Sequence, residues 1–134
     1  KGSIYDCRGY RLPTEAEWVY VAQQSKHTHV GTDDAWVAEN SNQSTHPVAQ
    51  KLANANGLFD LHGNVWEWCH DVYEELPAGH SINPQGPATG RMHVSRGGSW
   101  RSSKAELTPF RPRYSHLPGN KTPTRGFRLA RSLP

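Results

Sequence analysis

Metal-binding side chains are the first candidates for chemistry in this sequence. His27 and His29 are separated by one residue and could offer two imidazole rings to one metal ion. A zinc or iron centre needs at least three converging donors with supporting contacts around them. The other histidines are scattered along the chain, as His46, His62, His70, His80, His93 and His116. We therefore expect solvated histidines on loops and no histidine metal centre.

The two cysteines are a second candidate for chemistry. Cys7 is flanked by turn-forming residues, and Cys69 directly follows a segment rich in tryptophan. The sequence alone leaves open whether the two thiols form a disulfide. Unpaired thiols, with Cys69 partly buried as a small apolar side chain, are the favoured interpretation.

Hydroxyl groups could also act as nucleophiles. Ser99, Ser102 and Ser103 precede Glu106 and His116 in the chain. A catalytic serine needs a base within hydrogen-bond reach and a third group that orients the base. Nothing in this spacing indicates such contacts, so we expect polar loop residues and no serine hydrolase.

Length and composition indicate what must position these residues. A chain of 134 residues has the size of one domain, so we expect a single domain over 1–134. Five Trp, five Tyr and three Phe would form a core of few, large side chains. The net charge of +3 comes without a basic helix or a nucleic-acid motif, so no nucleic-acid partner is expected. No stretch reaches the roughly 18 apolar residues that a membrane span requires.

The clearest local signal is a helix over residues 13–24. Thr14 and Glu17 form the T-x-x-E pattern in which each side chain binds the backbone amide of the other residue. Trp18, Val21 and Ala22 then form one apolar stripe that should pack inward. The polar stretch over residues 25–45 follows as a long loop, with Trp36 as its expected anchor.

Three further segments are predicted to be extended. Residues 57–69 (GLFDLHGNVWEWC) should form a strand, a tight turn at Gly63-Asn64 and a second strand. Residues 93–100 and 126–131 should form strands as well. In the last of these, Phe127 and Leu129 would share one face while Arg128 lies on the other.

Four ordered motifs carry a resemblance to a known family. They are GYRLPTEAEW at 9–18, GLFDLHGNVWEW at 57–68, RGGSW at 96–100 and GFRLAR at 126–131. Together they resemble the formylglycine-generating enzyme, or sulfatase-modifying factor, family across nearly the whole chain. The resemblance implies an α+β, C-type-lectin-like fold with little regular secondary structure, long loops and a small twisted antiparallel sheet. Family members carry an N-terminal portion ahead of the first motif, so we expect this chain to be the C-terminal part of a larger protein.

The resemblance also implies a calcium ion at the GLFDLHGNVWEW segment. Its ligands would be the carboxylates of Asp60 and Glu67 and the backbone oxygens of Gly63 and Val65. Hard cations bind several oxygen atoms of this kind. The alternative is that Glu67 pairs with an arginine and Asp60 caps the turn.

The chain departs from the enzyme at the two cysteines that bind copper in the family. The matching positions hold Ser102 and Leu107, and neither side chain binds a soft copper ion as a thiolate does. Neither copper nor iron is therefore expected, and the chain is interpreted as a non-catalytic, calcium-stabilised domain that binds a ligand or a protein. The alternative is a divergent oxidoreductase that uses Cys69, or the substrate lobe of an iron-dependent sulfoxide synthase, whose iron ligands would come largely from another domain.

The segment 101–125 is the predicted binding surface, because in related proteins diversified by retroelements the residues between GGSW and GFRLA contact the ligand. Its side chains form a basic, partly aromatic set suited to carboxylate, phosphate or sulfate groups. An equally weighted alternative is that the arginine stems cover tryptophan rings. The predicted ligand-binding residues are Arg101, Ser102, Lys104, Arg111, Arg113, Tyr114 and His116.

Overall fold

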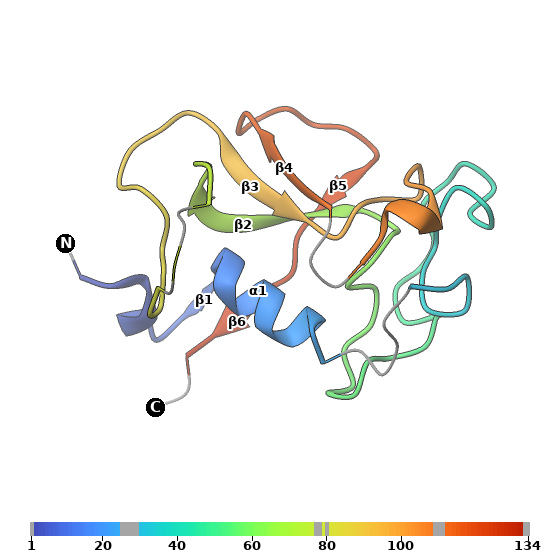
Figure 1. Cartoon of the computed structure of the whole chain (residues 1–134), viewed down its shortest axis with the longest axis horizontal. Coiled ribbons are helices and arrows are strands. Elements are labelled where there is room, and N and C mark those ends of the chain that lie inside the picture. The colour runs from blue at the N-terminus through green and yellow to red at the C-terminus, as the bar shows by residue number, and fades with distance from the viewer. Residues whose placement is uncertain (1, 25–29, 77–78, 80, 109–111, 133–134) are drawn as a thin grey trace.

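The computed structural model describes residues 2–24, 30–76, 79, 81–108 and 112–132 (Figure 1). Regular elements are few and short. In chain order they are η1 (Ile4–Asp6), β1 (Tyr10–Arg11), α1 (Glu15–Ala22), β2 (Trp66–Val72), β3 (His93–Arg96), η2 (Lys104–Glu106), β4 (Arg113–His116), β5 (Arg125–Gly126) and β6 (Ala130–Arg131). The described residues between α1 and β2 form turns, bends and one isolated bridge, as expected for a chain rich in Gly, Pro and Asn.

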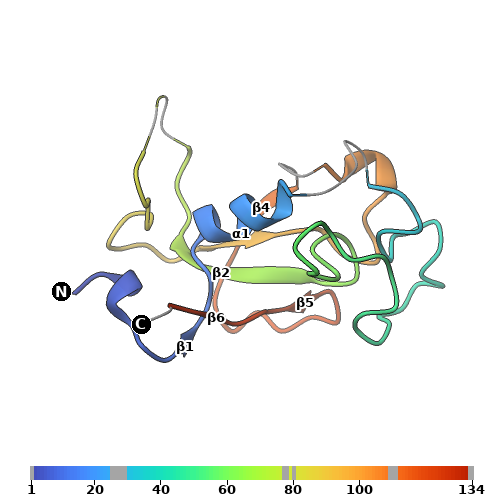
Figure 2. The same ribbon diagram turned by 90° about the horizontal axis from the view of Figure 1, so that it is seen from below.

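The strands form two sheets. One has four strands in the order β4-β3-β2-β5, and the other pairs β1 with β6 at the two ends of the chain. Three of the pairings are antiparallel, whereas β2 and β5 run parallel. The helix α1 lies along one face of the four-stranded sheet, as the view from below makes plain (Figure 2). We call this the helix face and the opposite side the open face.

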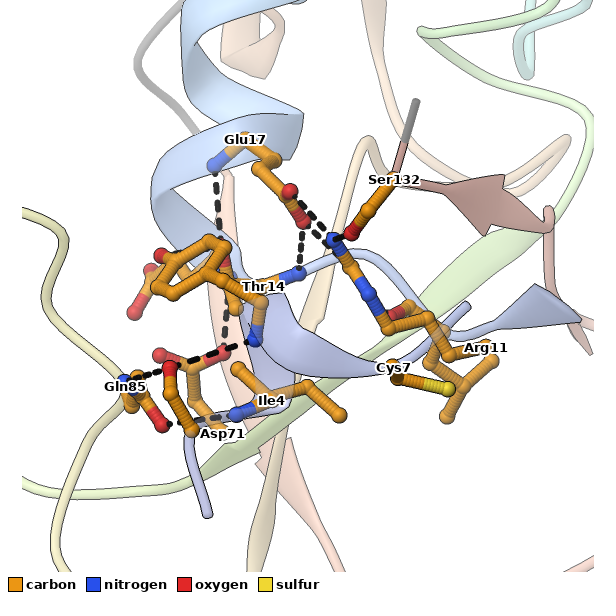
Figure 3. A network of polar contacts seen from close by, with 12 residues as sticks. Ile4, Cys7, Arg11, Thr14, Glu17, Asp71, Gln85 and Ser132 are labelled. Carbon is orange, nitrogen blue, oxygen red and sulfur yellow. Dashed lines mark hydrogen bonds and ion pairs between the residues drawn. The ribbon is translucent and has the colours of Figure 1, made fainter. Parts of the chain in front are cut away.

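The predicted helix start is confirmed at α1. The Thr14 hydroxyl accepts a hydrogen bond from the Glu17 amide at 3.2 Å, and the Glu17 carboxylate accepts one from the Thr14 amide at 2.8 Å. Arg11 donates two hydrogen bonds to the same carboxylate at 2.6 and 2.7 Å and a third to Ser132 at 3.2 Å (Figure 3). Asp71 on β2 accepts a bond from the next free amide, that of Glu15. Because these partners come from three parts of the chain, the cap also fixes α1 against the sheet.

The main core lies between α1 and the helix face. Trp18 and Ala22 are buried against Leu61, Cys69 and Val94. The indole nitrogen of Trp18 donates to the Glu67 carboxylate at 2.6 Å, so the largest core side chain has its one polar atom satisfied. This confirms the inward stripe predicted for the helix.

Trp36 anchors the long loop, as predicted. Its ring stacks on His46 at 3.7 Å between centroids, and the Lys51 ammonium lies 3.9 Å from its centroid. Its carbonyl accepts from the Asn64 amide at 2.8 Å. A Cβ at Gly63 would collide with this carbonyl, and Gly63 has a φ of +70°, so glycine is required there.

The strand predictions are correct only in part. Residues 57–62 form no strand, because Asp60 has a φ of +56° and breaks the extended backbone. The strand predicted over 93–100 ends at Arg96, where two glycines with positive φ follow. The strand predicted over 126–131 is two short ones, β5 and β6. The alternation there is confirmed, with Phe127 and Leu129 exposed and Arg128 turned inward to Glu67.

Both cysteines are free thiols. Cys69 is fully buried in the core and Cys7 is partly exposed near the N-terminus. No helix in the described parts of the chain is long and apolar enough to cross a membrane.

Candidate functional site

The open face of the four-stranded sheet carries a cluster of aromatic rings. Side chains alternate along a strand, so β2 directs Trp66 and Trp68 to this face while Glu67 points to the helix face. From β4, Tyr114 and His116 reach the same face. Ring centroids lie 6.0 Å apart for Trp66 and Tyr114, 5.8 Å for Trp68 and His116, and 4.9 Å for Tyr114 and His116. We call these four residues the aromatic cluster.

Arg125 on β5 borders the aromatic cluster. Its guanidinium carbon lies 5.9 Å from the Trp68 ring, and Nη1 donates to the Asn120 carbonyl at 2.8 Å. Its Nε is buried and has no hydrogen-bond partner among the described residues. Burial lowers the pKa of Arg125.

His116 adds a polar atom to the cluster without adding charge at neutral pH. Its Nδ1 shares a hydrogen bond with the Ser95 hydroxyl at 2.8 Å. Burial, and secondarily Arg125, lowers the pKa of His116 to about 4. The hydroxyl that His116 contacts belongs to Ser95, which is 1% exposed. It is not one of the serines at 99, 102 or 103. A buried hydroxyl of this kind is not accessible to a substrate.

The residues predicted as one binding surface lie in several places. Tyr114 and His116 belong to the aromatic cluster. Arg113 points to the helix face, where it donates two hydrogen bonds to Glu15 at 2.6 and 2.9 Å. Arg101 lies over the Trp100 ring at 4.6 Å, as the alternative of arginines covering tryptophans predicted. Arg111 lies outside the described residues.

Lys104 is separate again, on the 3-10 helix η2. Its backbone amide hydrogen-bonds the carboxylate of Glu39, and its side chain is exposed. The predicted single surface is thus divided among two sheet faces and one loop. The prediction did not include Trp66, Trp68 and Arg125, although the alternation in VWEW already indicated that the two tryptophans share a face.

Ser102 and Leu107 lie side by side against Gly98. A Cβ at Gly98 would be 2.7 Å from Leu107 Cδ2 and 3.0 Å from Ser102 Oγ. The Ser102 hydroxyl accepts from the Ser99 amide at 3.1 Å, and Leu107 is 1% exposed. Leu107 forms a second apolar cluster with Val30, Ala35 and Val37. A hydroxyl and a core leucine thus occupy these two adjacent positions.

Comparison with known proteins decides the family. The model of the sulfatase-modifying factor enzyme 1-like domain matches residues 1–133. The chain belongs to this family. Among curated relatives, it is 40% identical to the serine/threonine-protein kinase pkn1 of Chlamydia caviae, covering 93% of the chain and 21% of the kinase. It is 34% identical to the formylglycine-generating enzyme of Streptomyces coelicolor, covering 91% of the chain and 46% of the enzyme. The chain thus spans less than half the length of either relative.

Solved structures agree on the fold of this sulfatase-modifying factor domain. Treponema denticola variable protein 1 superimposes with a TM-score of 0.86 at 37% identity, over 96% of this chain and 50% of that one. PvdO from Pseudomonas aeruginosa superimposes with a TM-score of 0.75 at 26% identity, over 92% of this chain and 53% of that one. The predicted α+β, C-type-lectin-like fold is confirmed.

One thiol of this sulfatase-modifying factor domain lies in the core. Burial raises the pKa of the Cys69 thiol well above its ordinary value, so the thiolate that would bind copper is disfavoured. In the described parts of the chain, no three His, Cys, Asp or Glu side chains converge on a possible metal position. His27, His29 and His80 lie outside those parts.

The two carboxylates expected to bind calcium differ in how many hydrogen bonds they already accept. One oxygen of Asp60, Oδ2, accepts from the Ala49 amide at 2.7 Å, while Oδ1 is buried without a partner among the described residues. The Glu67 carboxylate accepts from Trp18 and twice from Arg128, each at 2.6 Å. The alternative pairing of Glu67 with an arginine is therefore present. Val65 directly precedes β2, and both Gly63 and Val65 lie between Asp60 and Glu67 in the sequence.

A pocket of about 530 Å³ opens on the other side of the sheet, at the N-terminal end of α1. Its lining is partly charged, and Val19 and Val72 contribute apolar walls. The charged residues are Glu15, Asp71, Glu74, Arg96 and Arg113. Its two arginines are paired, because Glu15 binds both Arg96 and Arg113. Burial, followed by the charge of Glu15, raises the pKa of Asp71. The pocket's cations are thus already bound to Glu15, whereas Arg125 on the open face forms no ion pair in the described parts of the chain.

Proposed function

We propose that this chain is a non-catalytic binding domain of the sulfatase-modifying factor family, and that the aromatic cluster with Arg125 is its ligand surface. The observation that carries the proposal is the burial of Leu107 in an apolar cluster, at a position where the family's copper chemistry requires a thiolate. A leucine integrated into the core stabilises the fold at that position and offers no electron pair to a metal. The neighbouring Ser102 offers only a neutral hydroxyl.

The open face supports the binding half of the proposal. Tyr114 is 58% exposed, and the half-buried tryptophans beneath it form a firm support. Aromatic side chains on a rigid sheet bind ligands at a small cost in conformational entropy, since each has only two rotatable bonds. Basic and aromatic residues from the predicted segment 101–125 reach this face together with residues of β2.

Measurements of copper binding and aldehyde formation test the proposal that the chain is non-catalytic. The purified chain is titrated with copper(I) against a competing chelator, and then incubated under oxygen with a sulfatase peptide that contains the substrate cysteine. We expect no copper uptake above that of a Cys7→Ser, Cys69→Ser control, and no aldehyde by mass spectrometry. The variant Ser102→Cys, Leu107→Cys should bind about one copper ion, because two adjacent thiolates suit this soft metal. Conversion of the peptide by the unaltered chain would overturn the proposal.

We also propose that calcium stabilises the loop before β2. The unpartnered Oδ1 of Asp60 and the backbone oxygens of Gly63 and Val65 would hold the ion, and Glu67 would share its carboxylate between the ion and Arg128. The buried, unpartnered oxygen supports this proposal, because such an atom is costly without a cation or a hydrogen-bond donor. The ion would hold an irregular loop in one conformation.

Thermal unfolding with calcium and with a chelator tests this site. At a calcium concentration of about 100 times Kd, the free energy of unfolding should rise by about 2.7 kcal/mol. The variant Asp60→Asn should lose this gain, and the matched variant Asp33→Asn, at an exposed loop position, should retain it. Equal melting temperatures in calcium and in chelator would overturn the calcium proposal and leave the non-catalytic proposal untouched.

A further inference from the structure

The open face combines apolar ring surface with one cation, Arg125, that forms no ion pair in the described parts of the chain. The aromatic cluster extends from β4 across β3 to β2, with Tyr114 outermost and the Trp66 and Trp68 rings half-buried beside it. Arg125 lies at the end of the cluster, on β5. A ligand that fits this face needs a flat apolar side next to an anionic group.

No carboxylate from the four strands competes for Arg125. The acidic residues of β2, Glu67 and Asp71, both point to the helix face, where they bind Trp18 and the Glu15 amide. The ion pairs in the described parts of the chain do not include Arg125. Among the described residues its hydrogen-bond partner is the Asn120 carbonyl, and its Nε, which is buried, has none. The donors left for a ligand are therefore those at the Nη1 and Nη2 end of the guanidinium that Asn120 does not use, and not the buried Nε.

We propose that this face binds a sugar that carries a carboxylate, with the pyranose ring against Tyr114 and the tryptophans and the carboxylate on Arg125. The C–H face of a pyranose is flat and apolar, so it packs on aromatic rings, and the carboxylate of a uronic acid is held rigidly beside that face. One compact unit therefore matches both features. Arginine binds a carboxylate through two parallel hydrogen bonds, which makes the contact directional. The inference rests on the proposed ligand surface and adds the class of ligand.

Hydroxyl recognition is available at the same place. His116 binds Ser95 through Nδ1, which leaves Nε2 as the other polar atom of the ring. The Thr124 carbonyl accepts from the Trp66 amide at 2.8 Å, and the Thr122 and Thr124 hydroxyls hydrogen-bond each other at 2.9 Å, so two hydroxyls stand in the segment next to Trp66. A sugar on the rings therefore meets donors and acceptors at its rim.

A matched pair of oligosaccharides tests the proposal. Tetragalacturonate and its methyl ester share every ring and differ in charge, and their binding to the full chain is measured by calorimetry and by tryptophan fluorescence. We expect tetragalacturonate to bind about ten-fold tighter than the ester at low salt. Equal affinities, or binding of neither sugar, would overturn the inference.

Three variants locate the site. Arg125→Gln should remove the preference for the acid while retaining weak binding of both sugars, and Tyr114→Ala should weaken both by about ten-fold. The control Arg131→Gln removes an exposed arginine of the other sheet and should change neither affinity. Retention of the acid preference in Arg125→Gln would overturn the assignment of the carboxylate.

An acidic peptide tests the alternative that the ligand is a protein. A Glu-Tyr repeat peptide offers rings and carboxylates on a flexible chain, and tighter binding of this peptide than of tetragalacturonate would replace the sugar with a protein partner. Either result leaves the copper and aldehyde measurements unaffected, so a failure here is distinguishable from a failure of the proposed function. Circular dichroism of each variant confirms that loss of binding does not reflect loss of the fold.

Discussion

The two faces of the four-stranded sheet are made from alternate residues of the same strands, yet their side chains have different partners. On the helix face, Glu15 from α1 binds Arg96 and Arg113, and Glu67 binds Arg128 and Trp18. On the open face, rings contact rings and the charge of Arg125 meets no carboxylate from the strands. Removing one partner of a buried charge pair is costly, so the helix face is expected to matter most for stability, whereas the open face is the one proposed to bind a ligand.

This contrast explains why the arginines of the basic C-terminal third have different roles. Arg113 and Arg125 stand on β4 and β5, at the two edges of the sheet. Arg113 is used by the fold, because its guanidinium lies between Glu15 and the Tyr73 ring at 4.4 Å. Arg125 lies on the opposite face and has no such acid. Net charge alone therefore predicts little about a ligand, since the side of the sheet decides whether a charge is used internally.

The largest expected effect of a single change is on the helix face. Glu15→Gln leaves Arg113 and Arg96 in a buried position without their shared charge, so the free energy of unfolding should fall by about 4 kcal/mol. Urea unfolding followed by tryptophan fluorescence measures this change. The matched variant Glu74→Gln alters an exposed carboxylate and should have little effect. A small loss for Glu15→Gln would remove the energetic distinction between the two faces.

The local parts of this contrast could be predicted from the sequence, and the long-range parts could not. The Thr14 and Glu17 cap depends on residues three positions apart, and the alternation of Phe127, Arg128 and Leu129 depends on strand geometry alone. The partner of Arg113 is Glu15, which is 98 positions away in the chain. No spacing rule connects two such residues, so the sequence could not indicate that the side chains of segment 101–125 stand on different faces of the sheet.

Backbone conformation limited the strand predictions in the same way. The apolar run before Gly63 is typical of a strand, but Asp60 has a left-handed φ and its carboxylate binds the Ala49 amide. That contact is made by tertiary structure and overrides the local preference. Leu107 was identified as a departure from the family, and only the fold shows that it lies in the core with Val30 and Val37.

A smaller effect is expected from pH on the open face. The pKa of His116 is lowered to about 4 in the folded chain, against an ordinary value near 6.5 in the unfolded chain. Between these two values the unfolded chain binds a proton that the folded chain does not. The stabilising contribution is therefore present above about pH 6.5 and is lost as the pH falls toward 4, by on the order of 1 kcal/mol after solvent screening.

Urea unfolding across this pH range, for the unaltered chain and for His116→Asn, measures the contribution. Asparagine retains an acceptor for the Ser95 hydroxyl and removes the titrating ring. The difference in the free energy of unfolding between the two proteins should shrink as the pH falls. A constant difference from pH 7.5 to pH 4.5 would mean that His116 is as easily protonated in the folded chain as in the unfolded one.

The smallest expected effect on stability is that of Tyr114→Ala, and it sharpens the contrast between the faces. Tyr114 is 58% exposed, and its hydroxyl has no hydrogen bond in the described parts of the chain, so truncation should cost less than about 1 kcal/mol. The substitution nevertheless removes the outermost ring of the aromatic cluster. A residue that contributes to binding and little to folding should show this separation between stability and affinity. A stability loss as large as that of Glu15→Gln would instead place Tyr114 among the residues that hold the sheet together, and the open face would then be a second structural surface.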